Sequence, residues 1–199
     1  MSVAEVTAID RISSNRDDEP LFEVINGEIV ELPPMSFHST KLATRLVGEI
    51  FAFLKINPLG EVASETLFRL PLEEDFHRNR RPDAAFVSYQ RWPRGKPEAY
   101  SDNAWDVVPD LAIEVVSPSD PLEDLMDKLG EYFEVDVRTV WVVHPRQKLV
   151  QVYESMVVMR AFRIDDTLDG GQVLPGFRLP LKEIFVSQMI DDREQSSDE

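Results

Sequence analysis

Residues 109–118 read PDLAIEVVSP, and the run 111–116 inside this stretch is apolar except for a single acidic residue, Glu114. Strands that are covered on both faces are apolar almost throughout, because neither face meets water. The stretch therefore predicts a central strand of a layered α/β domain. The turn formed by 117–120 leads into a helix that we expect at about 121–134.

On either side of this strand, the sequence predicts further strands and one long helix. Asn26-Gly27 separates two β-rich runs, and such a pair readily adopts positive φ at both central positions of a hairpin turn. Ser36 offers an N-cap to a helix whose apolar residues recur at helical spacing. The expected elements are strands at 21–25 and 28–32, a helix at about 37–56, a strand at 62–70, a charged loop at 73–81, strands at 83–87, 137–143 and 149–153, and one or two edge strands between 157 and 185.

The length of the chain and its composition indicate one folded domain. A chain of 199 residues falls within the usual size of a single domain. We expect a loose lead-in at 1–19, one domain at 20–187, and an acidic, disordered tail at 188–199. No stretch approaches the roughly 20 apolar residues that span a bilayer, so we expect no membrane partner and place the chain in the cytoplasm. The absence of cysteine excludes disulfides, thiolate metal sites and a cysteine nucleophile.

Glu114 requires an explanation, because an unpaired carboxylate inside an apolar strand costs several kcal/mol. It is either paired with a cationic side chain or it binds a ligand. Asp83 has a similar position, since it follows Pro82 and opens another apolar strand. Two carboxylates from neighbouring strands can converge on one Mg²⁺ ion, which takes oxygen ligands and keeps several waters. Asp110 is an alternative ligand, but it lies roughly 13 Å from Glu114 at about 3.3 Å per residue.

Lys128 is the basic residue that geometry brings to Glu114. Glu114 lies roughly 10 Å before the end of its strand, at about 3.3 Å per residue. Lys128 lies roughly 10 Å into the following helix, at about 1.5 Å per residue, and that helix runs back over the sheet. The two side chains are therefore expected at one level. The alternative for Lys128 is a solvated lysine that pairs with Asp124 at helical spacing.

The charge of the chain bears on its partners. A formal net charge of −16 opposes nonspecific adhesion to nucleic acid, although part of the acidic excess lies in the tail. Basic side chains flank Asp83 in the sequence, interleaved with Tyr89 and Trp92, and offer contacts to phosphates and unstacked bases of DNA. The alternative is a solvated loop that balances an acidic protein. The basic residues are Arg78, Arg80, Arg81, Arg91, Arg94 and Lys96.

Several of these motifs, in this order and spacing between about residues 20 and 155, resemble a restriction-endonuclease family of bacterial proteins. That family is assigned to the PD-(D/E)XK nuclease superfamily. The motifs are 22–28 (FEVINGE), His38, Arg81-Pro82-Asp83, 109–118, Lys128 with Tyr132, and 140–143 (VWVV). The resemblance implies a restriction-endonuclease-like core, with a mixed central β-sheet flanked by helices and an N-terminal β-hairpin.

The resemblance also implies roles for individual residues. Asp83 matches the metal ligand of the proline-aspartate motif, and Glu114 matches the second acidic ligand, so that the pair would hold Mg²⁺ or Mn²⁺. The superfamily's usual lysine position, two after Glu114, is occupied by Val116, and relatives that carry the lysine on the following helix make Lys128 the substitute.

Three further residues shared with the family pattern are candidates for supporting the site: Glu28, His38 and Tyr132. Each has a simpler alternative. Glu28 can stabilise the end of the hairpin, and His38 can stabilise the first turn of its helix. Tyr132 lies four residues after Lys128, where it can pack against the lysine side chain.

The function that these residues indicate is metal-assisted hydrolysis of DNA phosphodiester bonds by an endonuclease. Many nucleases of this type cut both strands as dimers, so a homodimer is also expected. The main alternative is a nuclease fold retained as a binding or scaffold module without turnover, which Val116 and the acidic charge favour. Acid–base chemistry on a glycoside is a third alternative, but the sequence offers no aromatic sugar platform.

Overall fold

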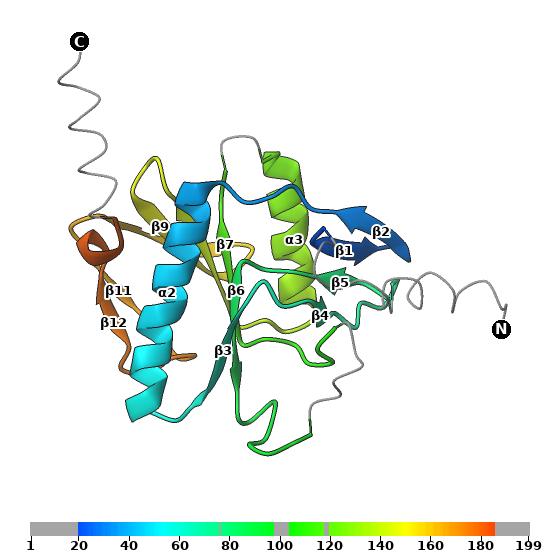
Figure 1. Ribbon diagram of the computed structural model, residues 1–199, viewed down its shortest axis with the longest axis horizontal. Helices are drawn as coiled ribbons and strands as arrows, with labels where there is room; N and C mark the ends of the chain where they lie inside the picture. Colours follow the sequence, from blue (N-terminus) through cyan, green and yellow to red (C-terminus); the bar gives the residue numbers. More distant parts are fainter. Residues whose placement is uncertain (1–19, 76, 98–103, 118–119, 186–199) are drawn as a thin grey trace, which may run out of the picture.

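The computed structural model describes residues 20–75, 77–97, 104–117 and 120–185 (Figure 1). The expected lead-in at 1–19 and the expected tail at 188–199 lie outside the described residues. Within the described ranges, the chain forms a mixed α/β fold around a central sheet.

A six-stranded sheet forms the centre of the fold, in the order β10-β9-β8-β7-β6-β3. Its strands are β3 (Gly60–Ser64), β6 (Ala84–Ser88), β7 (Leu111–Val115), β8 (Thr139–His144), β9 (Leu149–Ser155) and β10 (Val158–Arg163). The pair β7–β8 is parallel and the other neighbours are antiparallel, so the sheet is mixed, as the sequence predicts. All five residues of β7 are buried, which confirms the central strand predicted from its apolar run.

A smaller sheet lies on one side of the central sheet, in the order β2-β1-β5-β4. Its strands are β1 (Phe22–Ile25), β2 (Glu28–Glu31), β4 (Phe68–Arg69) and β5 (Asn79–Arg80). The predicted N-terminal hairpin is confirmed, and both turn residues have positive φ, 53° at Asn26 and 78° at Gly27.

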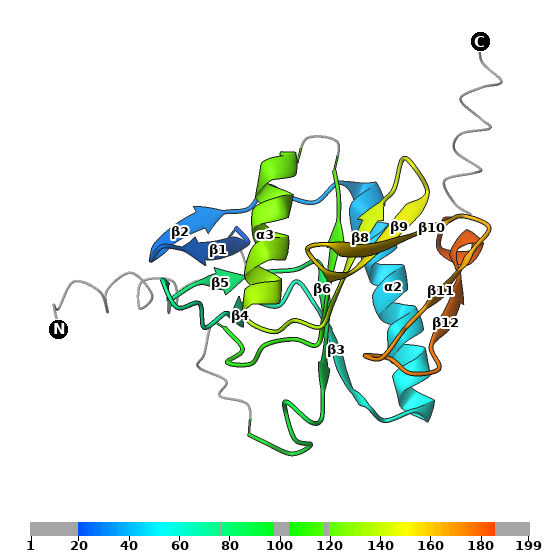
Figure 2. The same cartoon turned by 180° about the vertical axis from the view of Figure 1, so that it is seen from behind.

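Two helices cover opposite faces of the central sheet (Figures 1 and 2). Helix α2 (Phe37–Ile56) begins where the sequence predicts, and the Ser36 hydroxyl accepts the backbone N–H of Ser39 at 3.1 Å. Its buried face, which includes Leu46 and Ile50, packs in one core cluster. Helix α3 (Leu122–Glu134) covers the other face beside the small sheet, and its buried residues are Leu129 and Tyr132. The strands β11 (Thr167–Asp169) and β12 (Arg178–Pro180) pair at the outer side of α2.

Two sequence expectations differ from the structure. The strand predicted at 62–70 is divided into β3 and β4, which belong to different sheets. The division falls after Ser64, where Glu65 has a φ of 47°, a value that ends an extended strand. The charged loop expected at 73–81 contains β5, whose two residues pair with β1 and β4. The small sheet thus combines the predicted hairpin with β5, a short strand whose local sequence does not resemble one.

Candidate active site

Glu114 lies on the α3 side of the central sheet. Its neighbours Ile113 and Val115 pack in the cluster under α2, and side chains alternate along a strand, so Glu114 faces α3. The Tyr132 hydroxyl donates to Glu114 Oε1 at 2.7 Å. The Lys128 ammonium lies 3.7 Å from the other oxygen, Oε2. Both carboxylate oxygens are therefore held by side chains of one helix.

Asp83 lies beside Glu114 at the same end of the sheet. Strands β6 and β7 pair Ala84 with Ile113. One step further along this antiparallel register, Asp83 is opposite Glu114, and both residues belong to the same face. Asp83 Oδ2 accepts the backbone N–H of Val115 at 2.5 Å, which ties the carboxylate to the end of β7. The two acidic residues selected from the sequence are thus neighbours.

The electrostatics of this pair favour the uptake of positive charge. Burial, followed by repulsion from Glu114, raises the pKa of Asp83 to about 7, against the lowering effects of the Val115 N–H and Lys128. Burial also raises the pKa of Glu114, although Lys128 and Tyr132 act in the opposite direction. The protein therefore does not fully compensate two negative charges at this place.

Lys128 is half-buried and reaches inward, as the strand and helix dimensions predict. Its ammonium lies 3.0 Å from Glu23 Oε1 in addition to its 3.7 Å contact with Glu114. Burial by itself lowers the pKa of Lys128, but the carboxylates of Glu114 and Glu23 outweigh it and raise the pKa above its ordinary value. Among the described residues, Lys128 makes no ion pair with Asp124, so the solvated alternative does not describe its position.

Glu23 is the member of this cluster to which the sequence assigns no role. It lies on β1, and its side chain is 2% exposed. Its Oε1 contacts Lys128 and accepts the backbone N–H of Arg81 at 3.0 Å, and its Oε2 accepts from Arg80 at 2.7 Å. The available signal was the one that identified Glu114: an acidic residue between apolar residues of a strand.

Two basic residues near the site are engaged with carboxylates. Arg80 donates to both oxygens of Glu131, at 2.6 and 2.7 Å. Arg78 donates to Glu131 at 2.8 Å and to Asp75 at 3.1 Å. These contacts fasten the small sheet to α3, and Arg80, which is buried, presents no free face to a ligand.

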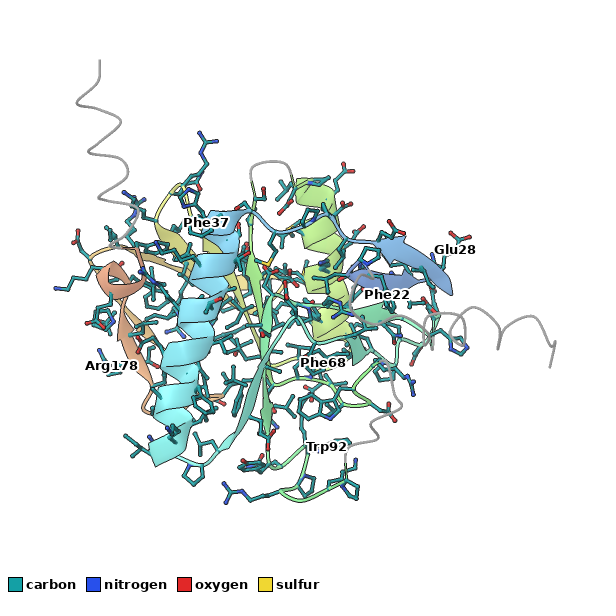
Figure 3. All side chains as sticks on the ribbon, in the orientation of Figure 1. Phe22, Glu28, Phe37, Phe68, Trp92 and Arg178 are labelled. Carbon is teal, nitrogen blue, oxygen red and sulfur yellow. The ribbon has the colours of Figure 1, made fainter. Side chains whose placement is uncertain are left out.

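The structure divides the remaining basic residues between two places. Arg81 lies beside Asp83 and donates to the carbonyl oxygens of Phe22 and Glu65. The other three follow β6, at the end of the strand opposite to Asp83, where Figure 3 shows Trp92. They are Arg91, which pairs with Asp110 and Asp136, Arg94, which lies over Tyr89, and Lys96, which lies over Trp92.

The other candidates from the sequence lie in different environments. Glu28 is exposed at the outer edge of the hairpin (Figure 3), and His38 is exposed in the first turn of α2. Within the described residues, neither makes an ion pair or hydrogen bond with Asp83, Glu114 or Lys128. Tyr132 does contact the site through Glu114. Asp110 is buried and forms ion pairs with Arg91 and Arg138.

The donor chemistry of the site fits a hard divalent cation held by two carboxylates. Mg²⁺ takes oxygen ligands, and it is commonly held by one or two carboxylates together with water and substrate phosphates. In the described part of the chain, no group of three or more His, Asp or Glu side chains lies close enough to hold a metal ion. Asp83 and Glu114 present two carboxylates from neighbouring strands, and a cation would balance their uncompensated charge.

Comparisons with known proteins agree with this arrangement at the level of family and fold. The family model described as "Putative restriction endonuclease", Uma2, matches residues 6–182. A solved structure, a putative nuclease belonging to DUF820 from Anabaena variabilis, is similar with a TM-score of 0.73 at 19% identity. The similarity covers 89% of this chain and 97% of that chain. No curated protein matches the sequence.

These findings confirm the family resemblance and the fold expected from it, a mixed sheet flanked by helices with an N-terminal hairpin. The described helices include none that is both long and apolar enough to cross a membrane.

Proposed function

Since the chain belongs to the Uma2 family of putative restriction endonucleases, we propose that it is a Mg²⁺- or Mn²⁺-dependent endonuclease that hydrolyses phosphodiester bonds of DNA. Asp83 and Glu114 are the proposed metal ligands, and Lys128 is the proposed third catalytic residue. The observation that carries the proposal is the convergence of the buried Glu114 carboxylate, the half-buried Asp83 carboxylate and one ammonium group where β6 begins and β7 ends.

In this mechanism, the residues of the chain bind and orient. Asp83 and Glu114 supply oxygen ligands from neighbouring strands, and Tyr132 fixes the Glu114 carboxylate through its hydroxyl. The cation, when bound, polarises the phosphate and lowers the pKa of a bound water. Lys128 offers an ammonium group to the attacking water or to the charge that develops on the phosphate. Val116 is apolar and takes no part in proton transfer.

The proposal extends to the partner and the cellular setting. Arg94 and Lys96 are exposed and are the proposed phosphate contacts, since the guanidinium groups of Arg78 and Arg80 are engaged with acidic side chains. The nuclease domain is proposed to comprise residues 20–187. The chain is further proposed to act in the cytoplasm as a homodimer, which would place two sites on one duplex.

A DNA-nicking assay tests the proposal. The wild-type chain is incubated with supercoiled plasmid and Mg²⁺ or Mn²⁺, with an EDTA control, beside Asp83→Asn and Glu114→Gln. We expect metal-dependent nicking by the wild type and none by either variant. Cleavage that persists in both variants would locate the activity elsewhere or in a contaminant.

A second candidate is a binding or scaffold module that keeps the nuclease fold without turnover. The observation that favours it is Val116 at the position where the superfamily usually has its lysine. DNA binding without nicking, with either metal and at full occupancy, would support this candidate.

A further inference from the structure

The Lys128 ammonium lies closer to Glu23 than to Glu114, at 3.0 Å against 3.7 Å. From this geometry we infer that Glu23 is a positioning residue: it holds the Lys128 ammonium, so that the Glu114 carboxylate remains available to a divalent cation. The inference deepens the proposed function and rests on it.

The Glu23 carboxylate is held firmly enough to position the Lys128 ammonium. Its side chain is buried, and both of its oxygens have partners: Lys128 and the Arg81 N–H at Oε1, and Arg80 at Oε2. A carboxylate held at two oxygens by partners on different elements cannot rotate away without breaking charged hydrogen bonds.

The charges of the site explain why a third carboxylate is needed. A divalent cation on Asp83 and Glu114 would lie near the Lys128 ammonium, and like charges repel strongly at short range. The negative charge of Glu23 offsets this repulsion. If Glu23 were neutral, Glu114 would be the one carboxylate among the described residues still in contact with Lys128, and the ammonium and the cation would compete for it.

A purely structural role for Glu23 is the competing explanation, because its contact with Arg80 also joins β1 to the rest of the small sheet. Glu131 provides the matched control. It binds the same guanidinium, at 2.6 and 2.7 Å, and its side chain is 14% exposed against 2% for Glu23, yet its ion pairs are with Arg78 and Arg80 and not with Lys128. A structural role predicts similar effects of Glu23→Gln and Glu131→Gln, whereas a positioning role does not.

The experiment measures Mn²⁺ affinity by isothermal titration and DNA nicking at saturating Mn²⁺, for the wild type, Glu23→Gln and Glu131→Gln. Partners that orient a metal ligand or its neighbour typically contribute 10–100-fold to affinity or activity, and we expect losses of about 10-fold or more in both measurements for Glu23→Gln. Glu131→Gln should retain wild-type affinity and turnover. Glu23→Asp, which keeps the charge, should recover part of both.

A double-mutant cycle tests whether Glu23 acts through Lys128. In a Lys128→Met background, Glu23→Gln should cause no further loss of turnover, because the group that it positions is gone. A structural role predicts that the losses multiply. If Glu23→Gln does not fold, Glu23→Asp replaces it in the same double-mutant cycle. The shorter aspartate side chain should lower turnover only where Lys128 is present.

The outcomes separate this inference from the proposed function. A wild-type chain that neither binds Mn²⁺ nor cleaves DNA overturns the proposed function, and the inference with it. An active wild type whose Glu23→Gln variant keeps full affinity and turnover overturns the inference alone. Equal losses in Glu23→Gln and Glu131→Gln, or multiplied losses in the Lys128→Met background, overturn it as well.

Discussion

Asp83→Asn should make the metal-free protein more stable at alkaline pH. The substitution preserves the size of the side chain, and the amide oxygen that it introduces can still accept the Val115 N–H. It removes a half-buried negative charge that is repelled by Glu114. A residue that serves only to stabilise the fold would show the opposite result, since its loss would destabilise the protein.

The magnitude follows from the pKa of Asp83, which is about 7 in the folded chain against an ordinary value of 3.8. A difference of about three units corresponds to an upper limit of about 4 kcal/mol. The folded state binds the proton more tightly, so this stability is fully present below pH 3.8 and is lost as the pH rises through about 7. Because water reaches part of the site, we expect about half of the limit, about 2 kcal/mol, or roughly 4–8 °C in Tm for a domain of this size.

Thermal unfolding in EDTA, at pH 5 and at pH 8.5, measures the effect. Asp83→Asn should exceed the wild type by the full difference in Tm at pH 8.5 and by only about a third of it at pH 5, which lies between 3.8 and about 7. The exposed Asp165 provides the control, since Asp165→Asn changes a surface side chain and should leave the Tm close to that of the wild type. An Asp83→Asn variant that is no more stable than the wild type at pH 8.5 would refute the electrostatic description of the site.

Three further predictions concern catalysis, DNA binding and the fold. Lys128→Ala should lower turnover by about 10²-fold or more with little change in Mn²⁺ affinity, and Val116→Lys in that background should restore part of the lost turnover. Equal turnover of the wild type and Lys128→Ala in a nicking time course would remove Lys128 from the mechanism. Arg94→Ala with Lys96→Ala should weaken DNA binding and flatten its salt dependence, because fewer counterions are released; an unchanged slope in a fluorescence anisotropy titration would show that this loop does not touch DNA. Gly60→Ala should destabilise the chain by about 1–3 kcal/mol in urea unfolding, because an added Cβ would overlap the Val87 carbonyl oxygen. Gly48→Ala, which meets nothing within 4 Å on helix α2, should not; equal effects would contradict the close packing of β3 on β6.

The sequence predicted the parts of the fold that are determined locally. The Asn26-Gly27 turn, the Ser36 cap and the apolar run of β7 each carry a signal within a few residues, and the structure confirms them. The contact between Lys128 and Glu114 was also predictable, because the rise per residue along a strand or a helix is nearly constant.

The features of the fold and the site that the sequence does not predict depend on contacts between residues that are distant in the sequence. The ion pair of Glu23 with Lys128 joins β1 to α3, and nothing near either residue encodes it. The two-residue strand β5 exists because β1 and β4 flank it. The sequence places the basic residues in one group because they are close along the chain, whereas in the structure β6 separates them by roughly 15 Å, at about 3.3 Å per residue.

The metal site is the central claim, and isothermal titration of the wild-type chain with Mn²⁺ at neutral pH tests it most directly, beside Asp83→Asn and Glu114→Gln. The two neighbouring carboxylates predict saturable binding by the wild type, release of protons on binding because the pKa of Asp83 is about 7, and loss of binding in both variants. Unchanged binding in both variants, or no binding by the folded wild type, would contradict a metal site formed by Asp83 and Glu114.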